Sequence, residues 1–165
     1  MSSLKSKTLF TITALSLSAV SGQAVANSCA YNVPQLRGLF QSQGHSTSWA
    51  SALLGQWQSQ SSSKTSFHFL EYNGGMYLAG QGPLGADAQP LSVCSTGTAN
   101  QYEIESQFNG LRVNILVQYS GGSRFEIVNI QPRMAAGLEG AYTQSSSGSA
   151  AGVAAYRPLL DQATR

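Results

Sequence analysis

The chain has 165 residues, of which 42% are hydrophobic and only 10% are charged, with nine Lys and Arg against seven Asp and Glu. This length is sufficient for one domain with its own core. The charges form no basic cluster, which argues against nucleic acid or an anionic membrane as the main partner.

Residues 1–26 have the pattern of a secretory signal peptide. Lys5 and Lys7 precede an apolar run over residues 9–20, and Ala-Val-Ala at 24–26 fits a cleavage site before Asn27. The apolar run is shorter than the roughly 20 residues that a membrane-spanning helix needs. We therefore predict a periplasmic or secreted protein with no membrane span. Cleavage would also remove Lys5 and Lys7 and leave the mature domain near neutral.

The chain has two cysteines, Cys29 and Cys94, and both follow the predicted cleavage site. Export and an even cysteine count predict one disulfide between them. Closing so long a loop stabilises a fold by roughly 4 kcal/mol in the chain-entropy model. The cysteines form no C-x-x-C motif and have no histidine cluster nearby, so we expect neither a redox pair nor a metal site, and no cofactor.

Residues 27–51 are predicted to form a segment ahead of the main fold. Pro34 and Gly44 bracket apolar residues at helical spacing, which predicts a short helix between them. The first long strand is expected over 53–59, and a serine-rich turn follows it at 60–64.

An Asn-Gly pair at 73–74 separates two runs of alternating polarity. Both central residues of a type I′ turn need a positive φ, so this pair predicts a tight hairpin between strands over 65–72 and 75–81. A two-residue turn then places Phe69 opposite Leu78, with both side chains on the inward face.

A second Asn-Gly pair, at 109–110, predicts a hairpin in which Ile104 lies opposite Ile115. A glycine-rich turn follows the second strand of this hairpin. Phe125 must share the inward face with Val117, so we expect an odd loop of three or five residues that pairs these two positions.

The rest of the chain is assigned more simply from its turn residues. We expect a loop over 82–90, a strand over 91–95, an irregular connection over 131–137, a last hairpin of strands over 138–144 and 152–157 around a mobile loop, and a short tail over 159–165.

These assignments give eight or nine short strands joined in sequence, which predicts an all-β fold. We expect an antiparallel up-and-down barrel of about eight strands over residues 52–158, because closure removes exposed sheet edges. A two-sheet β-sandwich is the alternative.

The inward positions of this barrel are rich in aromatic residues, and an eight-stranded barrel has room for its own side chains or for one small ligand. A filled interior and an interior with room for a ligand both stay open, because the inward residues Gly80, Ser106 and Gly140 are small. The residues predicted to line the interior and to contact a ligand are Trp57, Phe67, Phe69, Leu78, Tyr102, Ile115, Phe125 and Tyr142.

In the predicted layout a short helix comes first, then Gly55-Gln56-Trp57 on the first strand, then hairpin strands, and Arg157 follows the last strand. This layout resembles the lipocalin and calycin barrels. The resemblance implies a small hydrophobic ligand, with Trp57 closing one end of the barrel near Arg157 as structural residues. The layout is also similar to small exported protease inhibitors, in which a segment such as 27–51 enters the target's cleft.

No catalytic signature accompanies this layout. His45 and His68 lie in different settings, and the neighbouring Glu103 and Glu105 fall on the wet face. We therefore predict a binding protein for a small hydrophobic ligand, with no catalytic residue. The alternative is an inhibitor or protein-interaction module that acts through its N-terminal segment and its loops at 82–90 and 144–151. A third option, an enzyme, would use an inward tyrosine in acid–base work.

Overall fold

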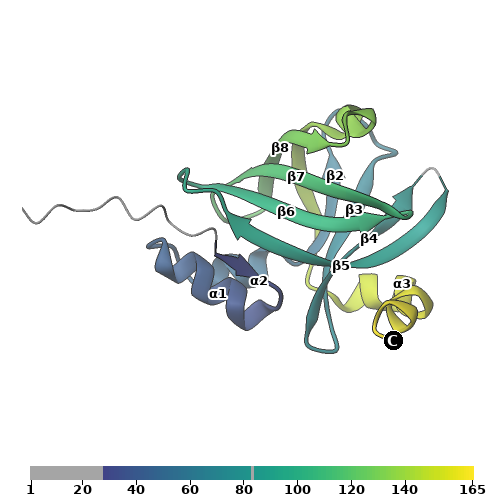
Figure 1. The fold of residues 1–165 in the computed structure, drawn as a ribbon, viewed down its shortest axis with the longest axis horizontal. Coiled ribbons are helices and arrows are strands. Elements are labelled where there is room, and N and C mark those ends of the chain that lie inside the picture. Colours follow the sequence, from purple (N-terminus) through teal and green to yellow (C-terminus); the bar gives the residue numbers. More distant parts are fainter. Residues whose placement is uncertain (1–27, 83) are drawn as a thin grey trace, which may run out of the picture.

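The chain forms a closed eight-stranded antiparallel β-barrel with one additional short strand and a C-terminal helix (Figure 1). In this computed structural model, residues 28–82 and 84–165 are described. The predicted signal peptide falls outside the described residues and stays a prediction. Among the residues that are described, no helix has both the length and the apolar character needed to cross a membrane.

The barrel strands follow one another in chain order, and β9 returns to pair with β2. This is the predicted up-and-down barrel rather than the sandwich. The strands are β1 (Cys29–Ala30), β2 (Gly55–Ser59), β3 (Ser66–Tyr72), β4 (Gly75–Gly82), β5 (Gly85–Ser95), β6 (Gln101–Phe108), β7 (Leu111–Tyr119), β8 (Arg124–Gln131) and β9 (Gly140–Ser147). The helices are α1 (Val33–Ser42), α2 (Ser48–Leu53), α3 (Ala150–Ala163) and the 3₁₀ helix η1 (Arg133–Leu138).

Both Asn-Gly hairpins have the predicted register. Phe69 pairs with Leu78 between β3 and β4, and Ile104 pairs with Ile115 between β6 and β7. The asparagine of each turn has a φ of 47°, the left-handed conformation that a type I′ turn requires. Local turn chemistry therefore sets the register of four of the eight barrel strands.

The β7–β8 turn is partly as predicted. The loop leaves five residues between the paired Tyr119 and Phe125, but the predicted pairing of Phe125 with Val117 is wrong, because Val117 pairs with Ile127. The error is two residues, so it preserves the inward face of both strands. A register shift further along β8 then brings Ile130 inward as well.

The predicted loop over 82–90 is wrong, because β5 begins at Gly85 and pairs with β4 as far as the Gly82–Gly85 pair. Glycine and proline in this stretch suggested a loop. Pro90 is tolerated inside β5 because the strand edge at this point has no partner from β6, so no ladder hydrogen bond is lost.

The predicted last hairpin is also wrong. The final barrel strand, β9, extends to Ser147, so much of the expected 144–151 loop is strand. The second strand and the tail are replaced by α3, which contains both Arg157 and Pro158. Its alanine-rich first turns favour a helix over the expected strand.

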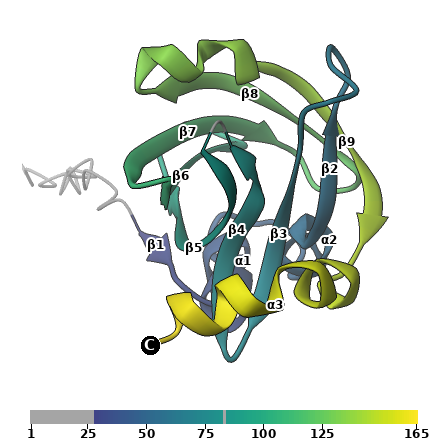
Figure 2. The same cartoon turned by 90° about the vertical axis from the view of Figure 1, so that its right-hand side faces the viewer.

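Two apolar clusters hold the fold together. The main cluster fills the barrel and includes the buried face of α1, and the second lies outside the wall between α3 and strands β3, β4 and β5. Figure 2 shows α3 lying against the outer surface of the wall. The predicted disulfide is present: Cys29 and Cys94 are directly paired between β1 and β5.

Candidate functional site

The interior of the barrel is filled by its own side chains. Seven of the eight residues predicted to line it are buried in the main apolar cluster, and the eighth, Phe67, is partly exposed and packs against that cluster. The Phe125 ring centroid lies 4.5 Å from that of Trp57 and 5.3 Å from that of Tyr142, against which it is stacked. The predicted ligand-contacting rings therefore contact one another, as in a packed protein core.

The two residues taken from the lipocalin layout occupy different environments. Trp57 is fully buried, and its indole N–H donates to the Leu53 carbonyl at 2.9 Å. Arg157 is exposed on α3, outside the barrel, so its predicted position at the end of the last strand is wrong.

The segment ahead of the barrel forms a lid rather than a free arm. Phe40 of α1 is buried and packs edge-on against Tyr102 at 5.2 Å, and the Tyr102 hydroxyl donates to Gln43 Oε1 at 2.6 Å. The Tyr119 hydroxyl donates to the Trp49 carbonyl at 3.2 Å. Burial raises the pKa of Tyr102 to about 12 and also raises the pKa of Tyr119. Both tyrosines are thus neutral hydrogen-bond donors that hold the lid in place.

The wall of the barrel is interrupted between β5 and β6. Their pairing runs from Ser95–Tyr102 to Leu91–Ser106 and stops there. Residues 85–90 of β5 pair with β4 but have no strand partner on their other edge. This seam is where backbone ladder hydrogen bonds are replaced by bonds from side chains.

The Asp87 carboxylate spans the seam. Its Oδ2 accepts the backbone N–H of Asn109 at 2.6 Å, and its Oδ1 accepts the backbone N–H of Ala88 at 2.9 Å. The Gln89 side-chain amide also donates to Oδ1, at 2.9 Å. One carboxylate thus satisfies backbone donors on both sides of the gap, which offsets the cost of leaving them unpaired.

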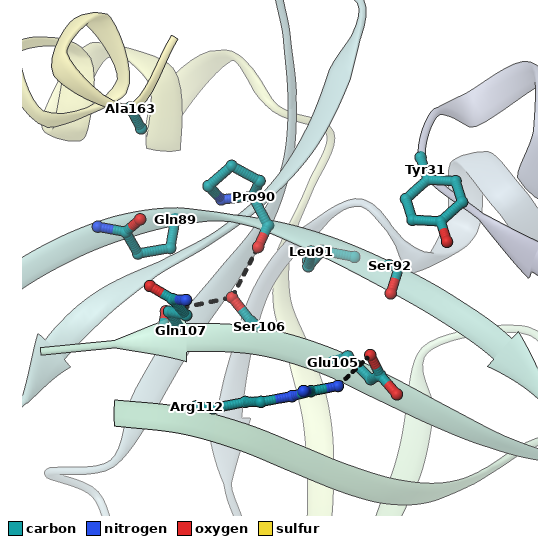
Figure 3. Close-up of a pocket in the computed structure, with 10 residues that line it drawn as sticks. All are labelled: Tyr31, Gln89, Pro90, Leu91, Ser92, Glu105, Ser106, Gln107, Arg112 and Ala163. Carbon is teal, nitrogen blue, oxygen red and sulfur yellow. Dashed lines mark hydrogen bonds and ion pairs between the residues drawn. The ribbon is translucent and has the colours of Figure 1, made fainter. Parts of the chain in front are cut away.

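The Ser106 hydroxyl serves the same purpose at the other end of the gap. It lies 2.9 Å from the Pro90 carbonyl, to which it donates, and 3.2 Å from the Gln107 carbonyl (Figure 3). Because Pro90 has no N–H, β6 could not complete a regular ladder here. Sequence reasoning missed this seam. The signals were a proline inside an alternating run and an aspartate three residues before it.

A groove of about 480 Å³ opens on the outside of the wall over this seam (Figure 3). Tyr31, which follows β1, is 61% exposed at its rim, and Arg112 and Glu105 form an ion pair at 3.2 Å. The residues that line the groove are Tyr31, Gln89, Pro90, Leu91, Ser92, Glu105, Ser106, Gln107, Arg112 and Ala163.

The chemistry of the groove suits recognition. Its lining combines an exposed aromatic ring, amides, hydroxyls and a balanced charge pair with the apolar side chains of Pro90, Leu91 and Ala163. The two histidines lie elsewhere: His45 stacks on Trp49 in the lid at 4.0 Å, and His68 lies beneath α3 next to Tyr156. Within residues 28–82 and 84–165, His, Cys, Asp and Glu side chains form no group of three that could hold a metal ion.

No protein-family model, curated protein or solved structure matches this chain.

Proposed function

We propose that this protein is an exported binding module that recognises a partner protein through the groove over the β5–β6 seam. The observation that carries the proposal is the contrast between a barrel filled by its own aromatic rings and a groove of about 480 Å³ on the outside of its wall. A packed interior offers a ligand no room, whereas a groove of this size can receive part of another molecule.

The composition of the groove favours a protein as the partner. Tyrosine and arginine are the residue types most often responsible for affinity in protein interfaces, and here Tyr31 and Arg112 both have exposed side chains.

The proposal is tested by photo-crosslinking from within the groove. A benzophenone amino acid replaces Gln107, which is exposed and lines the groove, or Glu126, an exposed control on β8. Each protein is irradiated in a periplasmic extract of the source cell. We expect a light-dependent adduct of defined mass from position 107 only, and a weaker one after Tyr31→Ala. Equal adducts from both positions, or none from position 107, would contradict the proposed surface.

Binding of a small hydrophobic ligand inside the barrel stays a prediction, supported by the fold and by the small inward residue Gly80. Since the interior rings contact one another, a ligand could enter only if some of them moved. Saturable binding of a fluorescent fatty acid, competed by a non-fluorescent one, is the result that this function requires.

A further inference from the structure

The C-terminal helix α3 is attached to the outside of the barrel by a separate apolar cluster. It follows Gly148, which has a φ of 79°, and lies against β3, β4 and β5 (Figure 2). Leu160 of the helix is completely buried against this wall, with Leu70 and Tyr77 among its neighbours. The helix is thus held in place by one face, without the closure that secures the barrel strands.

His68 lies directly beneath the first turn of α3. The approach is so close that a Cβ atom added at Gly152 would lie 2.8 Å from His68 Nδ1 and 2.4 Å from Leu70 Cδ2. The ring of Tyr156, one turn further along the helix, lies 5.4 Å from the imidazole. The absence of a side chain at Gly152 therefore allows the helix to pack on the histidine.

The surroundings of His68 disfavour its charged form. Burial lowers the pKa of His68, and the positive end of the α3 dipole lies over the ring. Its strand neighbours are uncharged, namely Gln56 on β2 and Ala79 on β4.

The charged groups of α3 do not stabilise the protonated form of His68. Arg157, next to Tyr156, is itself positive, and Asp161 accepts a hydrogen bond from Tyr72. Glu71, on the same strand as His68, is exposed. Among the described residues, no ion pair to His68 is present.

We propose that α3 is a pH-sensitive strap, whose docking on the barrel wall weakens when His68 becomes protonated. Because Ala163 near the end of α3 packs in the same apolar cluster and also lines the seam groove, loosening the strap changes one wall of that groove. The strap goes beyond the proposed binding function and does not depend on it.

The direction of the effect follows from linkage. His68 has a lower pKa in the docked state than in the undocked state, so docking has its full strength above the ordinary histidine value of about 6.5. As the pH falls below that value, the equilibrium constant for docking decreases. The decrease is at most about tenfold per pH unit, and it is confined to the range between the pKa of His68 in the undocked state and its pKa in the docked state.

Hydrogen exchange measured by mass spectrometry tests the strap on the mature chain with its disulfide intact. We compare peptides from 150–163 with peptides from β7 at pH 7.5 and pH 5.0, after correction for intrinsic exchange rates. We expect the α3 amides to open severalfold more often at pH 5.0, while β7 stays protected. Equal protection of α3 at both pH values would overturn the proposal.

Two substitutions assign the effect to one histidine. His68→Gln should abolish the pH dependence of α3 exchange, whereas His45→Gln, at the only other histidine, should leave it unchanged. Persistence of the pH response in His68→Gln would overturn the proposal. If His68→Gln also loosens β7, the test is made by NMR on the wild-type chain. The Val153 methyl signals should then titrate with the same midpoint as the His68 ring, and a midpoint that matches the His45 ring would refute the strap.

Discussion

Replacing Asp87 by alanine removes the carboxylate that spans the seam. The backbone N–H groups of Ala88 and Asn109 then lose their acceptors, and the Gln89 amide loses its partner. A hydrogen bond to a charged group contributes about 1.5–3 kcal/mol to stability. Because the site is only half-buried, water can bind some of the freed N–H groups in the variant and reduce the loss. We therefore expect Asp87→Ala to lower the free energy of unfolding by about 2–4 kcal/mol.

The comparison with asparagine separates hydrogen bonding from packing. Asp87→Asn keeps one acceptor oxygen and nearly the same shape, so we expect it to lose less, about 1–2 kcal/mol. Glu126→Ala removes an exposed carboxylate from β8 and should change stability by less than about 0.5 kcal/mol.

Urea unfolding followed by tryptophan fluorescence, with the disulfide oxidised, measures all three variants. Amide exchange should also increase at Asn109 in Asp87→Ala, since its N–H is the donor across the gap. If Asp87→Ala unfolds with the wild-type free energy, or if Glu126→Ala costs as much, the carboxylate does not hold the seam.

Three further predictions concern the lid and the barrel. Gly121→Ala should destabilise the fold by about 2–4 kcal/mol, because a Cβ there would lie 2.4 Å from Trp49 Nε1 and because a φ of 81° is strained for alanine. The control is Gly122→Ala, where the φ is 76° but the added Cβ meets open space, so it should cost only about 1 kcal/mol in the same urea experiment. Reducing the disulfide, which links residues 65 apart, should cost about 4 kcal/mol, measured as the loss of unfolding free energy in dithiothreitol. Stability should fall as the pH rises from about 10 toward 12, because burial raises the pKa of Tyr102 to about 12 in the folded chain; Tyr102→Phe should reduce that pH dependence, and an unchanged profile would contradict it.

The parts of the fold that local chemistry determines could be predicted from the sequence. The two Asn-Gly turns set the register of their hairpins, and alternation then placed Phe69, Ile104 and Ile115 inside the barrel. The β7–β8 pairing was wrong by two residues, an even number, so the face of Phe125 was still right. The disulfide followed from the cysteine count and the predicted export.

The parts that depend on tertiary contacts could not be predicted in the same way. Gly152 and Pro158 look like helix breakers, yet Gly152 is required where α3 packs on His68. Asp87 is a residue type that is common in loops, and it spans the seam only because its carboxylate accepts the N–H of Asn109, which lies 22 positions further along the chain. The candidate groove was missed because it forms where the β5–β6 pairing stops, and an alternating pattern does not show where the pairing of two strands stops.

The state of the barrel interior can be read from one NMR signal. The indole N–H of Trp57 donates to the Leu53 carbonyl, and the Trp57 ring contacts Phe125 inside the barrel, so this signal reports on a molecule that displaces these rings. The chain, with its disulfide intact, is titrated with cis-parinaric acid while this resonance is followed. We expect no saturable shift, because the interior is already full. A saturable shift of the Trp57 signal would show that the barrel opens to a ligand and that recognition takes place inside the wall.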